Sequence, residues 1–245
     1  MKKLWYYIRD RMNPTLMMTI IGALIGAGVG VFLSMQNGSV TQQPVHSWQE
    51  LINGLKTVGL PLPMVGSIGL WMFLYIYWEA AARRAAVTIE IESRPSRFTH
   101  VLLLNVAQLM LFLPVYGLRA RFIPNLFVFT VLGFSIQLGF LLWAVWARRI
   151  LGQNWSGAIA TTINQQLLQS GPYKFIRHPI YTGLLGMYLG TAFISGEIHA
   201  LIGFALAVLA YWRKIRLEEQ HLHDLFGAEY EEYCSTTWAL IPGIV

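Results

Sequence analysis

The chain has 245 residues, of which 55% are hydrophobic and only 12% are charged. A soluble domain carries about twice that charged fraction, so the composition argues against a soluble globular protein and for an integral membrane one. The net charge of +6 would suggest nucleic-acid binding in a soluble protein. In a membrane protein, Lys and Arg at the ends of spans explain it, and we expect no nucleic-acid partner.

Six apolar segments are candidates to cross the hydrocarbon core, where a helix needs roughly 17 residues or more. In chain order they are Thr15–Met35, Leu60–Ala80, Phe98–Leu118, Pro124–Ala147, Pro179–Gly196 and Glu197–Trp212. The first has no convincing cleavage site behind it and is expected to stay in the mature protein. The last two are short and meet at Ser195-Gly196-Glu197, which predicts a tight hairpin. The expected fold is all-α and integral to the membrane, with about six transmembrane helices.

The distribution of basic residues predicts the orientation of these spans. With the N-terminus inside, fifteen of the 18 Lys and Arg residues fall in inner segments, and only Lys56, Arg119 and Arg121 fall outside. The sequence therefore predicts a multi-pass protein with both termini in the cytoplasm, and we expect it in a bacterial or archaeal inner membrane.

The segments between the spans divide the chain into two regions. Ser47-Trp48-Gln49-Glu50 fits a capping box and predicts a short amphipathic helix on the outer interface. Residues 79–94 are predicted to extend the second span as a helix into the cytoplasm. We expect four spans in residues 1–147, and in residues 148–245 a core of a helical hairpin, a cytoplasmic loop and a C-terminal amphipathic helix. Cys234 is the single cysteine, so no internal disulfide can form, and no metal site is expected.

The first polar motif runs from Gly171 to Gly183 and reads GPYKFIRHPIYTG. Pro179 suits the first position of a helix, which places Arg177 and His178 beside free backbone N–H groups. Such an end attracts a carboxylate. The plain alternative is that Arg177 and His178 only anchor a span at the interface.

The second polar motif follows the sixth span and contains the pair Glu218-Glu219. Most of residues 213–233 fits an amphipathic interfacial helix. Acidic residues gain nothing from the negative potential of an inner leaflet. A carboxylate at this place suits ribose hydroxyls or an ammonium group.

Together the two motifs resemble the isoprenylcysteine carboxyl methyltransferase family, which is related to membrane phospholipid N-methyltransferases and small-thiol methyltransferases. The pattern is R-H-P-x-Y-x-G, a hydrophobic hairpin, and E-E-x-x-L-x-x-x-F-G-x-E-Y-x-x-Y, and the resemblance covers residues 149–242. It implies a cytoplasmic pocket for S-adenosyl-L-methionine, formed by the last hairpin and the C-terminal helix.

The resemblance also implies roles for individual residues. The implied cofactor-binding residues are Gln165, Leu167, Leu168, Gly171, Tyr173, His178, Pro179, Ile180, Tyr181 and Glu218, and the implied catalytic residues are Arg177, Lys214 and Glu219. Lys214 stands where the family has an arginine implicated in placing the acceptor carboxylate, and lysine lacks the bidentate fork. Thr237-Trp238 replaces the family's V-P.

The expected function is transfer of a methyl group to a membrane-associated acceptor, most like isoprenylcysteine carboxyl O-methylation, with membrane lipids around the protein and a lipidic or prenylated acceptor. A phospholipid amine or a small thiol stays open as acceptor, and for an amine either Glu219 or His178 could take the proton. A non-catalytic membrane protein that retains the fold is a further alternative. A transporter is disfavoured because no acid is evident at depth in the membrane, where Asn105, Gln108 and Gln137 are the main polar residues.

Overall fold

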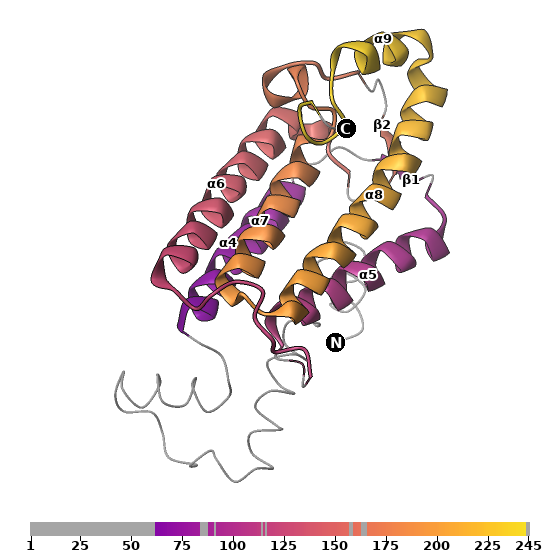
Figure 1. The fold of residues 1–245 in the computed structure, drawn as a ribbon. Helices are drawn as coiled ribbons and strands as arrows, with labels where there is room; N and C mark the ends of the chain where they lie inside the picture. The colour runs from indigo at the N-terminus through magenta and orange to yellow at the C-terminus, as the bar shows by residue number, and fades with distance from the viewer. Residues whose placement is uncertain are drawn as a thin grey trace.

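The computed structural model describes residues 62–83, 88–90, 92–113, 115, 117–156, 159–162 and 166–243. The elements are α4 (Leu62–Ala82), β1 (Thr88–Glu90), α5 (Arg94–Phe112), α6 (Phe127–Leu151), the 3₁₀ turn η1 (Gly152–Asn154), β2 (Ala160–Thr162), the 3₁₀ turn η2 (Gly171–Lys174), α7 (Pro179–Ser195), α8 (Ile198–Phe226) and α9 (Ala228–Thr236). In Figure 1, α4, α6 and α7 run alongside one another, α5 packs beside α8, and α9 lies at the end where α8 finishes.

Every predicted span among the described residues overlaps a helix, so the helical fold class is confirmed. The predicted span Phe98–Leu118 runs past the end of α5 at Phe112. By length and composition, two of the described helices could cross a membrane: Phe127–Asn154, with a mean hydropathy of 2.0, and Ile198–Phe226, with 1.4. The count of six spans is therefore not confirmed. The segment Thr15–Met35 and the expected interfacial helix after Ser47 lie outside the described residues.

The predicted hairpin between the last two spans is confirmed. Helix α7 ends at Ser195, and Gly196 follows in the left-handed region with a φ of 67°. Its N–H donates to the carbonyl of Ala192 at 2.7 Å, which satisfies a carbonyl at the helix end. Helix α8 then begins after Glu197.

The prediction of a helix through residue 94 is wrong. Helix α4 ends at Ala82, and residues 88–90 form β1, which pairs antiparallel with β2 so that Ile89 lies opposite Thr161. Residues 87–92 read VTIEIE, an alternation of apolar and polar residues with three β-branched residues at its start. This is a strand pattern, and it outweighs the continuation of the preceding helix.

Polar side chains inside the bundle bind neighbouring helices. The Ser67 hydroxyl lies 3.2 Å from that of Thr191, and the Trp71 indole N–H donates to Thr191 Oγ1 at 3.0 Å. The Gln137 amide donates to the carbonyl of Ser67 at 3.2 Å. These bonds connect α4 with α6 and α7, which is the ordinary use of polar side chains between membrane helices.

Helices α6 and α7 approach closely because glycines face each other. A Cβ added to Gly190 would lie 2.6 Å from the backbone nitrogen of Gln137 and 2.7 Å from the carbonyl oxygen of Gly133. These are backbone atoms, so the helices themselves would have to separate. The contact sets the position of α7, which carries the His178–Tyr181 end into the candidate site described below.

Gly190→Ala is expected to lower the free energy of unfolding by roughly 1–3 kcal/mol, because an extra methyl group overpacks the contact. Thermal unfolding in detergent measures the change. Gly139→Ala on α6 is the matched control, since a Cβ there meets nothing within 4 Å. The control is expected to keep or raise the Tm through its better helix propensity. Equal loss of Tm in both variants would contradict the close packing of α6 on α7.

Candidate active site

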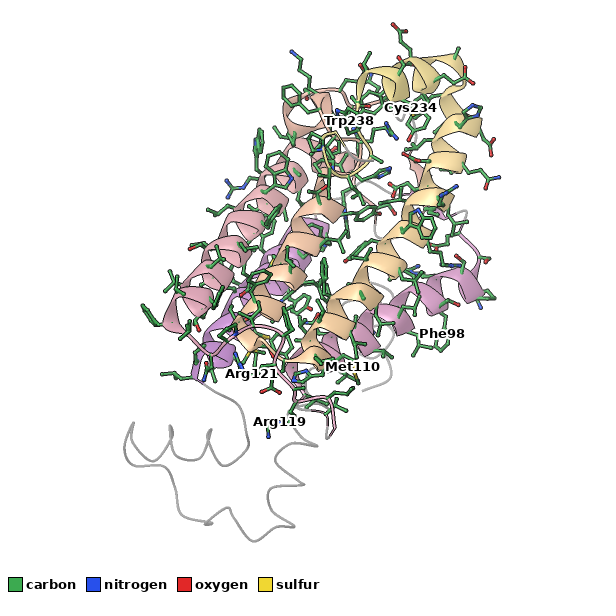
Figure 2. The ribbon with its side chains drawn as sticks, viewed as in Figure 1. Phe98, Met110, Arg119, Arg121, Cys234 and Trp238 are labelled. Carbon is green, nitrogen blue, oxygen red and sulfur yellow. The ribbon has the colours of Figure 1, made fainter. Side chains whose placement is uncertain are left out.

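A pocket lies where α6 and α8 end and α7 begins. Figure 2 places Cys234 and Trp238 at this end of the molecule and Arg119 and Arg121 at the opposite one. The residues that line the pocket are Leu151, Asn154, Trp155, Ser156, Ile159, Gln166, Leu167, Leu168, Tyr173, Arg177, His178, Pro179, Ile180, Tyr181, Glu218, His221, Leu222, Phe226, Tyr230 and Tyr233. Apolar and aromatic walls thus surround a small number of polar groups, as in most small-molecule sites.

The start of α7 is held by backbone hydrogen bonds to the C-terminal segment. The Trp238 N–H donates to the carbonyl of Phe175 at 3.0 Å, and the Arg177 N–H donates back to Trp238 at 2.8 Å. The His178 N–H donates to the carbonyl of Ala239 at 3.1 Å. Pro179 then begins the helix as predicted, where its missing N–H costs nothing.

Glu218 is the acidic group of the pocket. Its Oε2 accepts a hydrogen bond of 2.7 Å from the Tyr181 hydroxyl and lies 3.9 Å from Nδ1 of His178. The His178 and Tyr181 rings are stacked, with centroids 5.6 Å apart. The carboxylate keeps about a third of its side-chain surface exposed, at 32%. It is therefore both oriented by the protein and accessible to a ligand.

Arg177 connects α7, α8 and the segment after α9. Its Nε donates to Glu219 Oε1 at 2.9 Å, and its Nη1 donates to the carbonyl of Thr237 at 2.5 Å and to that of Cys234 at 3.4 Å. Burial alone would lower the Arg177 pKa, but the hydrogen bond and charge of Glu219 outweigh it, and the pKa is raised. Glu219 Oε1 also lies 3.4 Å from His178 Nε2. The guanidinium thus stays charged and fixed at the edge of the pocket.

Two tyrosines, Tyr173 of η2 and Tyr233 of α9, line the pocket. The Tyr233 hydroxyl donates to the carbonyl of Tyr173 at 2.6 Å, which joins α9 to η2. Burial raises the pKa of Tyr233 to about 12, with Arg177 opposing the shift. Burial, Glu218 and Tyr233 together raise the pKa of Tyr173. Both phenols are therefore neutral at physiological pH and offer aromatic faces and hydroxyls, not charge.

A cation–π contact positions the wall after α6. The Arg148 guanidinium lies 4.5 Å from the centroid of the Trp155 ring. It also donates to the carbonyl of Gly152 at 2.7 Å and to that of Ala81 at 3.1 Å. These contacts bind the end of α4 to η1 and hold Trp155 in the lining, where its indole presents an apolar surface.

The structure brings most of the predicted site residues together. Those that line the pocket are Leu167, Leu168, Tyr173, Arg177, His178, Pro179, Ile180, Tyr181 and Glu218. Gly171 lies outside the lining, at the start of η2 with a φ of 60°. Glu219 lies behind Arg177 and His178. Gln165 lies outside the described residues.

Lys214, like Glu219, is a predicted catalytic residue that does not line the pocket. Its ammonium is paired with Glu92 Oε2 at 2.5 Å, and its side chain is only 5% exposed. The sequence around Lys214 does not reveal which carboxylate pairs with it, because Glu92 is 122 residues away in the chain.

Sequence reasoning missed several lining residues, among them the polar residues Asn154, Gln166 and His221. His221 follows Glu218 by three residues on α8, and Leu222 follows it by four, so all three share one helix face. That spacing was readable in the sequence. Asn154 and Gln166 had no comparable signal, since each lies in a connection whose path is set by tertiary contacts.

Comparisons with known proteins match the part of the chain that forms most of the pocket. Residues 126–229 match the phospholipid methyltransferase family. The resemblance to isoprenylcysteine carboxyl methyltransferases, expected from the motifs, is confirmed. The match contains α6, the start of α7 and the acidic pair of α8, and so most of the pocket.

Among named relatives, the protein-S-isoprenylcysteine O-methyltransferase of Schizosaccharomyces pombe is 32% identical over 47% of this chain and 52% of its own length. The methanethiol S-methyltransferase 1 of Bradyrhizobium diazoefficiens is 39% identical over 29% of this chain and 24% of its own. The matched part thus spans about half of the first relative and a quarter of the second. A solved eukaryotic intramembrane Ras methyltransferase aligns with a TM-score of 0.45 and 14% identity, over 95% of this chain and 99% of that one.

Arg177→Lys is expected to lower the free energy of unfolding by about 2 kcal/mol, because lysine cannot donate to Glu219 and Thr237 in the same geometry. The loss is measured as a lower Tm in detergent. Arg149→Lys, at an exposed position in the last turn of α6, is the control and is expected to leave the Tm unchanged. A Tm for Arg177→Lys equal to that of the control would contradict the role of Arg177 as a connector.

Proposed function

We propose that this protein is an integral membrane methyltransferase that uses S-adenosyl-L-methionine and acts on a membrane-associated acceptor, most like isoprenylcysteine carboxyl O-methylation. The observation that carries the proposal is the pocket in which Glu218 and Tyr181 meet among aromatic and apolar walls. The names of the isoprenylcysteine relatives support the acceptor class.

The residues of the pocket fit this cofactor in charge and shape. The partly exposed carboxylate of Glu218 suits an ammonium group or ribose hydroxyls, and Leu167, Leu168 and Ile180 supply an apolar surface for an adenine ring. Tyr173 and Tyr181 are neutral aromatic groups beside this carboxylate, and such faces attract a sulfonium cation. Bound S-adenosyl-L-methionine would supply an activated methyl group on that sulfonium.

Methyl transfer to a carboxylate depends on the positioning of the two reactants more than on acid–base catalysis. In an in-line displacement, the acceptor oxygen forms a bond to the methyl carbon as the carbon–sulfur bond breaks, and S-adenosylhomocysteine leaves. A carboxylate is already nucleophilic, so the protein has to hold it in line and exclude water. Arg177, a fixed cation in the lining, is our candidate for placing the acceptor carboxylate. Glu219 acts by holding Arg177 and His178.

An amine or thiol acceptor is the second candidate, and the position of Lys214 favours it. Lys214 is bound by Glu92 outside the lining, so it does not offer its charge to an acceptor carboxylate there. The methanethiol S-methyltransferase relative and the phospholipid methyltransferase match belong to this chemistry by name. For an amine, His178, which lines the pocket, is the candidate to take the proton.

We also propose that the pocket faces the cytoplasm and that both termini lie on that side. Arg119 and Arg121 lie at the far end of the bundle from Cys234 and Trp238 (Figure 2). Arg148 and Arg149 lie in the last turn of α6, Arg177 lines the pocket, and Arg213 and Arg216 shortly precede Glu218 on α8. This separation supports the orientation that the positive-inside rule predicts.

The first test is calorimetric binding of S-adenosylhomocysteine to the full chain purified in detergent. Micromolar binding is expected for the wild type. Glu218→Gln and Tyr181→Phe are each expected to bind at least about tenfold more weakly, since each removes a charged hydrogen bond worth about 1.4 kcal/mol or more.

Glu229→Gln is the matched control, because Glu229 is exposed on α9 and does not line the pocket. It is expected to bind as the wild type does. Absence of binding by well-folded wild type would overturn the proposed function and leave the non-catalytic alternative in its place.

The second test identifies the acceptor atom. Methyl-labelled S-adenosyl-L-methionine is offered with N-acetyl-S-farnesylcysteine, phosphatidylethanolamine or methanethiol, and the product is treated with base. A carboxyl methyl ester releases labelled methanol, whereas an N-methyl or S-methyl product does not. Methanol release with the farnesylcysteine is the expected result, and label retained only on the lipid amine or the thiol would establish the second candidate.

A further inference from the structure

The buried ion pair between Lys214 and Glu92 lies beside the pocket but outside its lining. It joins Lys214 of α8 to Glu92, which lies between β1 and α5. The side chains of Lys214 and Glu92 are 5% and 2% exposed. Removing two charges from water to this extent is costly, so the pair needs further hydrogen bonds to be stable.

Glu92 makes those further bonds. Its Oε1 accepts from the Ser96 hydroxyl at 3.0 Å, and its Oε2 accepts from the Ile159 N–H at 3.3 Å as well as from Lys214. Its own N–H donates to the carbonyl of Ile159 at 3.1 Å. Burial alone would raise the Glu92 pKa, but the bond and charge of Lys214 and the other donors outweigh it and lower the pKa. The carboxylate is thus ionised and fully engaged.

This cluster is joined to the pocket at two places. Ile159, whose N–H and carbonyl are both bound by Glu92, lines the pocket just before β2. Lys214 precedes Glu218 by one helical turn on α8, and Glu218 is the acidic group of the pocket. The pair therefore connects the wall at Ile159 with the turn of α8 that carries Glu218.

Arg213 strengthens the same connection without lining the pocket. Its guanidinium donates to the Ser96 hydroxyl at 2.9 Å and to the Ser96 carbonyl at 3.3 Å. Ser96 in turn donates to Glu92, so two successive residues of α8 bind the start of α5. The spacing of α5, the β1–β2 ribbon and α8 is thus set by one polar cluster.

We infer that Glu92 and Lys214 are positioning residues for the cofactor pocket, acting as a unit that holds the Ile159 wall at a fixed distance from Glu218. The inference rests on the proposed function, since it assigns the pair to the binding of that cofactor. It also gives Lys214 an indirect role in place of direct contact with an acceptor. Lys214 and Glu92 neutralise each other, so removal of either side chain leaves an unpaired buried charge. The surrounding residues must then shift to let water reach that charge.

The test is calorimetric binding of S-adenosylhomocysteine to the full chain with Glu92→Gln, Lys214→Met and the double variant. Each single variant is expected to raise the Kd at least about tenfold, because the unpaired charge displaces Ile159. The double variant is expected to return to within about threefold of the wild type. In it no charge is left unpaired, and the amide oxygen at position 92 still accepts from the Ile159 N–H.

Glu197→Gln is the matched control for a purely structural effect. Glu197 belongs to a second cluster at the far end of the bundle, where it lies 3.0 Å from His199 Nε2 and 3.5 Å from Arg119 Nε. This variant is expected to lower the Tm and to leave the Kd unchanged. The Tm of every variant is recorded in parallel, so that a loss of folding is separated from a loss of affinity.

The outcomes separate the inference from the proposed function. Wild type that binds, with single variants that bind equally well, would overturn the inference and leave the proposed function standing. Weak binding by the singles without recovery in the double would also overturn it, because the pair would not act as a unit. Wild type that does not bind would overturn the proposed function and the inference with it.

Discussion

The hydrogen bonds between residues 175–178 and residues 238–239 bring two distant parts of the chain together at one end of the bundle. They hold the start of α7 against the segment that follows α9, and Arg177 adds bonds to Glu219 of α8 and to the carbonyl of Thr237. These backbone N–H and C=O groups have no partner within a helix, and such groups must be hydrogen-bonded when they are buried. The pocket exists because these segments meet.

Two adjacent glutamates of α8 have different tasks because successive residues of a helix point in different directions. Glu218 lies in the lining, bonded to Tyr181, with part of its carboxylate accessible. Glu219 lies against Arg177 and His178. His178 lies between the two acids, so the first turn of α7 is bound on both sides. Tyr181 orients the carboxylate of Glu218, and Glu219 neutralises the charge of Arg177.

The bundle below the pocket is held by close helix contacts and by polar groups that bind one another. Gly133 and Gly190 allow α6 and α7 to approach, and Ser67, Trp71 and Thr191 connect α4 to α7. Gln137, one of the polar residues that a transporter would need at depth, instead donates to the carbonyl of Ser67. Such contacts keep α7 in one register, and the position of His178 and Tyr181 follows from that register.

The sequence by itself determined the apolar cores of the described helices, the hairpin at Gly196 and the start of α7 at Pro179, whereas the assignment of Glu218 to the pocket came from the family resemblance. The first three are local features, because hydropathy, a proline at a helix start and helical spacing act over a few residues. Only the tertiary structure decided that residues 88–90 pair with residues 160–162, that Glu219 binds Arg177, and that Glu92 binds Lys214. Each of these contacts depends on which distant segment packs alongside. The residues next to a carboxylate or a strand in the sequence do not indicate its partner.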